Sequence, residues 1–270
     1  MATTQIPNTA TGAPAAAAQV HPGTLIRAAQ EGVTFRQRFT SKSANLQFLA
    51  CGEFTLPPGA ESQSFCLPTR ESLLFQWEGS ASVVVDGALF ELQTYDTLYV
   101  PRGADVVLAN PAGATARLFQ CSAAAEKAHP VFHSKFAEFS KNEGRIRHLK
   151  GKDVFLMFDV SEPAEKLIAG YTFFQPGQRS WPPHNHTDQE EVYIFINGHG
   201  SMEVYSEPET LSFVHNVNRG DMVTIPFLNY HPVFSQADPL EFIWCIAGER
   251  YWVGDKNKDF MKGTTGPITT

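Results

Sequence analysis

Short hydrophobic runs separated by turn residues recur along most of the chain. The clearest are Leu46–Cys51, Ser72–Trp77, Ala81–Val85, Thr97–Val100, Val154–Phe158, Leu167–Phe174, Val192–Ile196, Met222–Ile225 and Leu240–Ile246. They are rich in β-branched and aromatic residues and are interrupted by Pro-Gly, Asp-Gly and Arg-Gly pairs, which is typical of strands joined by turns. Helical signals are confined to about residues 123–127 and 135–140. The pattern therefore predicts an all-β protein built as a sandwich or barrel.

The two halves of the chain repeat the same landmarks in the same order. The pairs are Pro58-Gly59 with Pro176-Gly177, Gly79 with Gly198, and Asp96-x4-Pro101 with Asp221-x4-Pro226. In this register hydrophobic residues of the first half fall where the second half has histidines: Phe65 and Leu67 against His184 and His186, and Val106 against His231. Such a repeat indicates two copies of one structural unit. We expect two tandem barrels, of which only the second carries the imidazoles.

Changes in composition divide the chain into five segments. Residues 1–22 are rich in Ala, Thr and Pro and are expected to form a disordered tail. The repeat predicts a first barrel over 23–140 and a second over 153–255, followed by a C-terminal tail at 256–270. The polar stretch 141–152 is predicted to be the linker between the barrels.

Composition excludes several classes of function. The formal charge of −7 and the lack of a basic stripe argue against nucleic-acid binding. No apolar run reaches the roughly 18 residues that a membrane span needs, and the N-terminus lacks the regions of a signal peptide. The four cysteines are scattered, without a Cys-x-x-Cys pair, so reduced and mostly buried thiols are expected. We therefore expect a cytoplasmic protein without nucleic-acid or membrane partners.

The segment from Trp181 to Tyr193 carries the strongest chemical signal. It places His184, His186 and Glu191 in the order His-x-His-x4-Glu, and His231 follows later. Residues two apart on a strand point to the same face, so one strand can aim both imidazoles at a common point. Three imidazole nitrogens and one carboxylate suit a divalent transition metal. No cysteine lies nearby, which favours an open catalytic site over a closed structural one.

The second half resembles the two cupin motifs. They run here as Gly177-x6-His184-x-His186-x4-Glu191-x6-Gly198 and Gly220-x5-Pro226-x4-His231. The chain departs from them at Leu228, where cupins usually have Gly, and at Ser235, where many have Asn.

A narrower resemblance concerns two related isomerase families. Four stretches are similar to the 5-deoxyglucuronate isomerases of inositol catabolism: 164–170, 178–186, 190–193 and 230–233. The stretch 242–249 is closer to the 5-keto-4-deoxyuronate isomerases of pectin breakdown. Both families have two cupin domains, of which the first lacks metal ligands.

This resemblance implies two tandem cupin (double-stranded β-helix) barrels and a metal-dependent ketol-isomerase. The substrate is expected to be a deoxy uronic acid, 5-deoxyglucuronate first and 5-keto-4-deoxyuronate as the alternative. It implies His184, His186, Glu191 and His231 as ligands of one divalent metal, zinc first, with Mn, Fe, Ni or Co also suited to imidazole-rich sites. The metal would polarise the carbonyl while a base moves a proton between adjacent carbons. The two-cupin families also favour a self-associating protein.

Two other functions are compatible with the same ligands. An iron-dependent cupin dioxygenase would use them to activate oxygen. A non-catalytic sugar-binding cupin would bind its ligand without converting it.

Candidates for proton transfer are the two tyrosines nearest the ligands. Tyr193 shares the inward parity of Glu191 on the expected strand, and Tyr230 adjoins His231. Glu191 itself is a further candidate, although the metal is expected to occupy it. Its neighbour Glu190 should point to the opposite face.

The carboxylate of a uronic acid needs a cation, best a guanidinium. Arg250 and Arg179 are the first candidates, and Trp181 is a candidate for stacking on the sugar. The stretch 141–152 has five basic residues in twelve. Besides being a linker, it could act as an arm that holds an anionic substrate through Arg145 or Arg147.

Overall fold

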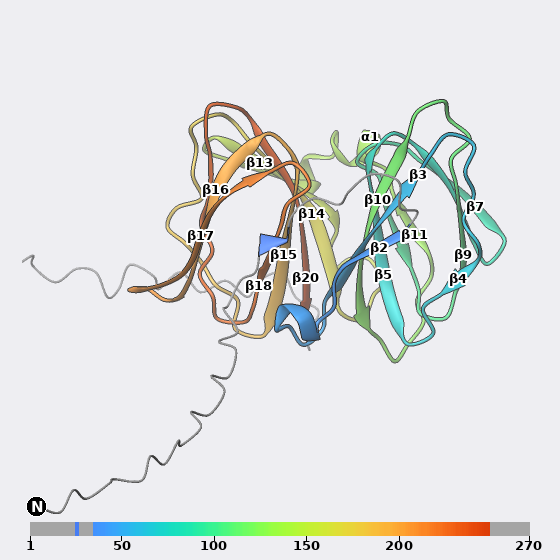
Figure 1. Cartoon of the computed structure of the whole chain (residues 1–270), viewed down its shortest axis with the longest axis horizontal. Helices are drawn as coiled ribbons and strands as arrows, with labels where there is room; N and C mark the ends of the chain where they lie inside the picture. Colours follow the sequence, from blue (N-terminus) through green and yellow to red (C-terminus); the bar gives the residue numbers. More distant parts are fainter. Residues whose placement is uncertain (1–24, 27–34, 249–270) are drawn as a thin grey trace, which may run out of the picture.

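Two β-barrels lie side by side in the computed structural model, which describes Leu25–Ile26 and residues 35–248 (Figure 1). The predicted all-β fold is confirmed. Helical structure in the described part comprises one α-helical turn, α1 (Phe136–Phe139), and 3-10 turns at Lys42–Ala44 and Glu143–Arg145. The turn expected near 135–140 is therefore present. The one expected at 123–127 is wrong, because Ala123 pairs with Glu71 in a strand ladder that overrides helix propensity, and no helix follows up to residue 127.

The first barrel is built from a six-stranded and a four-stranded sheet. The larger has the order β11-β8-β5-β10-β3-β2 and the smaller β4-β9-β6-β7. The strands are β2 (Phe35–Phe39), β3 (Ala50–Leu56), β4 (Phe65–Cys66), β5 (Arg70–Glu78), β6 (Ala81–Val85), β7 (Ala88–Leu92), β8 (Thr97–Val100), β9 (Asp105–Ala109), β10 (Ala116–Ala124) and β11 (Phe132–Ser134).

The second barrel combines a seven-stranded and a three-stranded sheet. Their orders are β1-β18-β15-β20-β14-β13-β12 and β17-β16-β19. The strands are β1 (Leu25–Ile26), β12 (Ile146–Leu149), β13 (Lys152–Phe158), β14 (Leu167–Phe174), β15 (Gln189–Asn197), β16 (His199–Glu207), β17 (Thr210–Asn218), β18 (Met222–Ile225), β19 (Val233–Ser235) and β20 (Leu240–Gly248).

The internal repeat is visible in the strand order. The run β8-β5-β10-β3 of the first barrel corresponds to β18-β15-β20-β14 of the second. The paired glycines have the same geometry. Gly79 and Gly198 have φ of 70° and 74°, and a Cβ atom would lie 2.7 Å from the oxygen of Thr115 and 1.9 Å from that of Pro239. A positive φ and a close backbone approach both require glycine at these two turns.

Three hydrophobic clusters form the core. One fills each barrel, and the third lies between the two large sheets, where Phe75 and Phe119 of the first barrel meet Met157 and Ile194 of the second. Strands β5 and β15 are therefore buried on both faces. This double burial explains why their sequences read as continuous hydrophobic runs rather than as an alternation.

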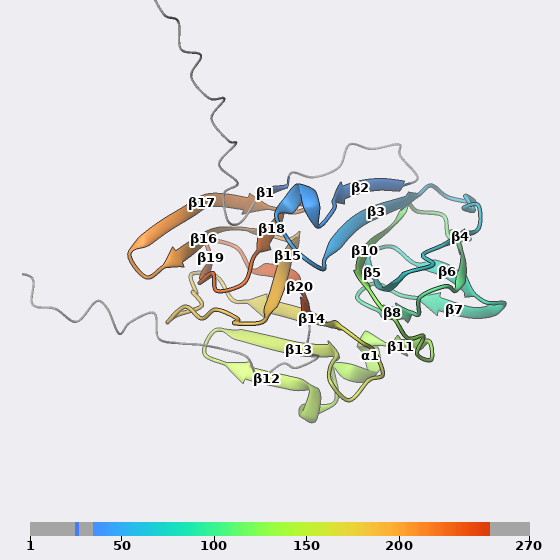
Figure 2. The same cartoon turned by 90° about the horizontal axis from the view of Figure 1, so that it is seen from below.

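The two edge strands of the seven-stranded sheet are β1, near the N-terminus, and β12, in the stretch between the two barrels (Figure 2). β1 pairs with β18, and Arg38 donates to the Gly220 oxygen at 2.9 Å. At the other edge the stretch 141–152 contains β12, which pairs with β13. Arg147, Lys150 and Lys152 of this stretch are thus placed on a hairpin of the second barrel, whereas Arg145 lies in the preceding 3-10 turn. No helix in the described residues is long and apolar enough to cross a membrane.

Candidate metal centre and active site

The four predicted ligands come from three segments of the second barrel. His184 and His186 lie between β14 and β15, Glu191 is in β15, and His231 lies between β18 and β19. The expectation that one strand carries both histidines is wrong, since neither belongs to a named strand. Pro182 and Pro183 directly precede them and have no N–H to donate to a ladder.

Asn185 ties the two histidines to the loop that carries His231. Its buried amide donates to the Leu228 oxygen at 2.9 Å, and the Leu228 N–H donates to the His186 oxygen at 2.7 Å. Leu228 has a φ of 63°, in the left-handed region that favours glycine. The departure from the cupin motif at this position therefore affects a supporting turn, not a ligand.

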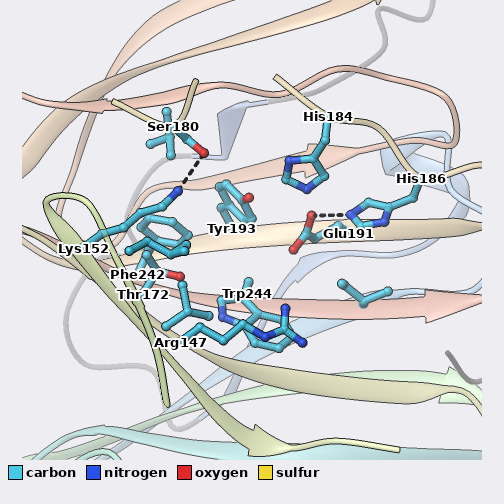
Figure 3. Close-up of a pocket in the computed structure, with 14 residues that line it drawn as sticks. Arg147, Lys152, Thr172, Ser180, His184, His186, Glu191, Tyr193, Phe242 and Trp244 are labelled. Atoms are coloured by element: carbon cyan, nitrogen blue, oxygen red, sulfur yellow. Dashed lines mark hydrogen bonds and ion pairs between the residues drawn. The ribbon is translucent and has the colours of Figure 1, made fainter. Parts of the chain in front are cut away.

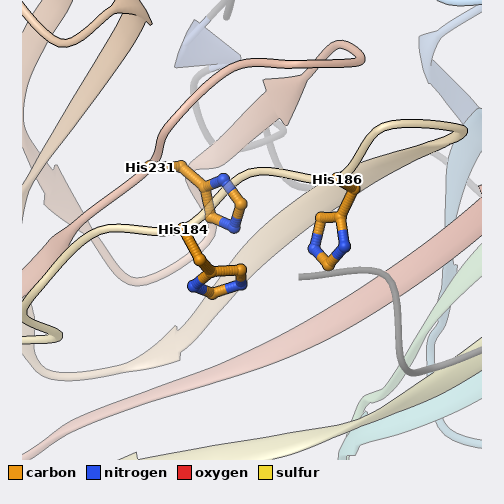
Figure 4. A group of neighbouring side chains, drawn as sticks. All are labelled: His184, His186 and His231. Carbon is orange, nitrogen blue, oxygen red and sulfur yellow. The ribbon is translucent and has the colours of Figure 1, made fainter. Parts of the chain in front are cut away.

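The side chains of the three histidines converge (Figure 4). One ring nitrogen from each lies within 4.8 Å of the others. The ring centroids of His184 and His231 are 4.5 Å apart, and those of His184 and His186 are 5.2 Å apart. Among the described residues this is the one group of three or more that could hold a metal ion.

Glu191 lies against two of the three histidines and is the candidate for a fourth donor. Its Oε2 atom is 3.3 Å from Nε2 of His186 and 3.1 Å from Nε2 of His231, and all three side chains are buried. Burial alone would raise the pKa of Glu191, but its contacts with His186 and His231 outweigh that effect and lower the pKa to about 2. The carboxylate is therefore ionised at neutral pH, as a metal ligand must be.

Two buried polar atoms of the cluster fit a metal ion. Nε2 of His231 and Oε2 of Glu191 are buried, and in the described part of the chain neither has a hydrogen-bond partner outside the cluster, which is costly inside a protein. Nδ1 of His231 lies 2.9 Å from the Asn229 oxygen and donates to it. This bond leaves the Nε2 lone pair directed at the cluster, the arrangement found in metal-bound histidines. The three imidazoles could therefore hold a divalent cation, with the carboxylate of Glu191 beside them.

A cavity of about 80 Å³ opens beside these ligands (Figure 3). Its wall contains three of the four candidate ligands, without His231, together with polar, aromatic and aliphatic side chains: Arg147, Leu149, Lys152, Val154, Thr172, Ser180, His184, His186, Glu191, Tyr193, Val233, Phe242, Trp244 and Ile246. Strands β12, β13, β14, β15 and β20 all contribute, so the seven-stranded sheet forms one side of the site.

The two candidate tyrosines are placed differently. Tyr193 lines the cavity, two residues beyond Glu191 on β15. Burial and the charge of Glu191 raise its pKa well above the usual value, so its hydroxyl is protonated at neutral pH. Tyr230 is buried beside His231 but is not part of the cavity wall; its backbone bonds that of Tyr205 at 2.8 and 2.9 Å. The geometry therefore favours Tyr193 over Tyr230 as the candidate for proton transfer.

Two of the predicted substrate-binding residues lie outside the cavity beside the metal ligands. Arg179 and Trp181 line an adjoining hollow of about 790 Å³, where the guanidinium of Arg179 stacks 4.5 Å from the indole centroid of Trp181. Arg250 lies outside the described residues. Arg145 of the basic stretch pairs with Glu162, whereas Arg147 lines the inner cavity.

Three further residues of the cavity wall are Lys152, Thr172 and Trp244. The sequence places Lys152 in the basic stretch without naming it as a binding residue, favours core packing over sugar stacking for Trp244, and does not single out Thr172. Strand parity offers a weak signal, because Trp244 pairs directly with Tyr193 and so faces the same side of the sheet.

A comparison with models of protein families shows to which family the chain belongs. The model described as the KduI/IolB family matches residues 24–262. The chain belongs to the KduI/IolB family. The resemblance inferred from the cupin motifs and their flanking stretches is thereby confirmed.

Curated relatives of this KduI/IolB chain are ketol-isomerases. The 4-deoxy-L-threo-5-hexosulose-uronate ketol-isomerase of Bacillus pumilus is 27% identical over 205 residues, which are 73% of each chain. The enzyme of the same name from Kineococcus radiotolerans is 30% identical over 198 residues, 67% of this chain and 68% of the relative. The prediction of an enzyme of the aldose–ketose isomerase class is confirmed.

Solved structures confirm the fold. An IolB-like protein from Salmonella typhimurium superposes with a TM-score of 0.73 and 21% identity, over 84% of this chain and 94% of that one. Oxalate decarboxylase of Lactobacillus farciminis superposes with a TM-score of 0.66 and 16% identity, over 86% of both chains. The KduI/IolB chain thus has the two tandem cupin barrels that its sequence predicts.

Proposed function

We propose that this protein is a metal-dependent ketol-isomerase of 4-deoxy-L-threo-5-hexosulose uronate, which is 5-keto-4-deoxyuronate. The reaction converts the C-1 aldehyde and C-2 hydroxyl into a C-1 hydroxyl and a C-2 ketone. One proton moves from C-2 to C-1 and one between the two oxygens, so no oxidant is consumed. The observation that carries the proposal is the convergence of three histidines beside a cavity, with ionised Glu191 in contact with two of them, in a KduI/IolB chain.

The names of the relatives support the second of the two substrates expected from the sequence. The sequence ranks 5-deoxyglucuronate first, on four short stretches around the metal motif. The curated relatives match over far longer stretches and act, by name, on the 4-deoxy-5-keto acid. We therefore propose the pectin-type substrate and not a role in inositol catabolism.

Three imidazoles and a carboxylate would hold the metal, for which zinc, manganese, iron, nickel and cobalt are all suitable. When bound, a divalent ion supplies Lewis-acid polarisation of the carbonyl and stabilises negative charge on the neighbouring oxygens. Glu191 acts as a ligand and not as the base, because its low pKa makes it a poor proton acceptor.

The neutral hydroxyl of Tyr193 is suited to donate a hydrogen bond to a substrate oxygen. It lines the cavity on the same strand as Glu191, and its ring packs against Phe242 at a centroid distance of 4.4 Å. This packing fixes the ring, so the hydroxyl is held in one place before substrate arrives. Donors held in this way stabilise charge that develops on oxygen, typically by about 3 kcal/mol.

Purified protein should be assayed with both uronates after loading with each candidate metal, and the products followed by NMR. We expect conversion of the 4-deoxy-5-keto acid, incorporation of solvent deuterium, and loss of activity with a chelator. Turnover should be unchanged under nitrogen, since an iron dioxygenase would stop without oxygen. Full metal content with no conversion of either uronate would refute the proposal.

A further inference from the structure

Four side chains of one hairpin point into the metal cavity. They are Arg147 and Leu149 of β12 and Lys152 and Val154 of β13, which lie in register opposite one another. This hairpin forms the outer edge of the seven-stranded sheet. The hairpin therefore places two cations in the wall beside the metal ligands.

The two cations are held differently. Lys152 is partly buried, donates from Nζ to the Ser180 hydroxyl at 2.8 Å, and lies 4.9 Å from the ring centroid of Phe174. These contacts fix the ammonium group at the junction of the inner cavity and the outer hollow, since Lys152 lines both. Arg147 forms no hydrogen bond or ion pair with the described residues, and its guanidinium is available to a ligand.

The same wall has a third donor. The indole N–H of Trp244 is buried and has no hydrogen-bond partner in the described part of the chain. Its ring lines the cavity together with Lys152 and Arg147, on the side away from His184 and His186 (Figure 3). A buried donor without an acceptor is costly unless a ligand or water supplies one.

Among the described residues, the wall has more cationic than acidic side chains. Of the described residues that line the cavity, Glu191 is the one carboxylate, and it faces the histidines. The whole protein has a net charge of −7, so this positive patch runs against the overall charge. Two cationic side chains and an indole N–H in one wall are complementary to an anion with several oxygen atoms.

We infer that Lys152, Arg147 and Trp244 bind the carboxylate of the substrate. The inference rests on the proposed function, in which the reacting aldehyde binds at the metal cluster. The carboxylate is at the opposite end of the six-carbon chain, and this wall lies across the cavity from the histidines. Binding the carboxylate there directs C-1 and C-2 to the metal ligands and makes the enzyme selective for uronates over neutral sugars.

The test compares a uronate with its neutral ester. The probe is the non-isomerising acid obtained by borohydride reduction of the substrate, together with its methyl ester. Binding to metal-loaded protein is measured by calorimetry, for wild type and for Lys152→Met, Arg147→Met and Trp244→Phe. The matched control is Lys150→Met, since Lys150 is exposed and lines the outer hollow but not the inner cavity.

We expect wild type and Lys150→Met to prefer the acid over its ester. Lys152→Met and Arg147→Met should each reduce that preference by about tenfold or more, the range for losing a hydrogen bond to a charged group. With the true substrate, both should raise KM more than they lower kcat, because the carboxylate is remote from the reacting carbons. Trp244→Phe keeps the ring and should give a smaller loss.

Two results would overturn the inference: an unchanged acid-to-ester ratio in both methionine variants, or an equal loss in Lys150→Met. A general folding defect can be distinguished from loss of the carboxylate site, because it would weaken binding of the acid and the ester alike and lower the metal content. Failure of the proposed function would give a different result from failure of this inference. It would leave wild type without turnover of either uronate while the preference for the acid persists.

Discussion

Glu71 and Glu190 occupy the same position in the two barrels, and each carboxylate binds the backbone of the opposite barrel. Glu190 accepts hydrogen bonds from three consecutive N–H groups just before β3, those of Gln47, Phe48 and Leu49, at 2.7, 2.7 and 2.5 Å. Glu71 accepts from the three N–H groups of Glu165, Lys166 and Leu167, at 2.9, 2.7 and 3.1 Å, where β14 begins. Both side chains are buried. The two barrels are thus joined by a symmetric pair of carboxylate clamps.

Replacing either clamp residue should destabilise the protein without changing a residue that lines the metal cavity. Glu71→Gln and Glu190→Gln each remove the charge and turn an amide towards backbone N–H groups. Each should lower the free energy of unfolding by about 2–3 kcal/mol, the loss expected for hydrogen bonds to a charged group. Guanidinium denaturation followed by fluorescence measures the change. Glu138→Gln is the control, because that side chain is 70% exposed and should give no effect. Wild-type midpoints in both clamp variants would contradict this role.

The clamps also show what strand alternation does to two identical neighbours. Glu190 and Glu191 are adjacent on β15 and point to opposite faces, as the sequence predicts. Glu191 faces the histidines, while Glu190 reaches the first barrel. The strand register places Ser72 of the first barrel opposite Val100, as Glu191 lies opposite Ile225. The first barrel therefore keeps the clamp residue and replaces the fourth metal ligand by serine.

The metal cluster could be predicted from the sequence because most of its residues are close together in the chain. Three of the ligands fall within eight residues, and His231 follows a proline landmark that both halves share. The two-barrel fold is predicted for the same reason, since turn glycines and hydrophobic runs repeat in order. The shared position of Lys152 and Trp244 in one wall could not be found in this way. They are 92 residues apart and meet only because β13, β14 and β20 lie together in one sheet.

The left-handed turn at Leu228 is predicted to cost stability. A non-glycine residue in this conformation loses about 1–2 kcal/mol, whereas glycine costs about 0.5–1 kcal/mol of chain entropy. The Leu228 side chain is 54% exposed, so its removal sacrifices little packing. Leu228→Gly should therefore stabilise the protein by about 0.5–1 kcal/mol in denaturant unfolding. Leu228→Ala is the control and should not stabilise it, because alanine keeps the strain. Equal effects of both variants would show that the turn is unstrained.

Removing one imidazole should release the metal while the fold persists. His231→Ala deletes a ligand whose Nδ1 is already fixed by the Asn229 oxygen, and a two-histidine site should bind more than about a hundredfold more weakly. Elemental analysis after dialysis measures the metal, and circular dichroism checks the fold. His215→Ala, an exposed position on β17, is the matched control and should retain full metal content. Retention of stoichiometric metal by His231→Ala would exclude this histidine as a ligand.

The two tyrosines proposed for proton transfer can be separated by paired phenylalanine variants. Tyr193→Phe removes the hydroxyl from the cavity wall but keeps the ring that packs on Phe242. Its kcat should fall about a hundredfold, the usual loss for one preorganised donor, while KM and metal content change little. Tyr230→Phe should retain kcat within about threefold, because its ring does not line the cavity and surface or packing changes of this size cost little. Steady-state kinetics with the 4-deoxy-5-keto acid decides between them. A larger loss in Tyr230→Phe than in Tyr193→Phe would mean that the catalytic hydroxyl approaches from the His231 side of the site.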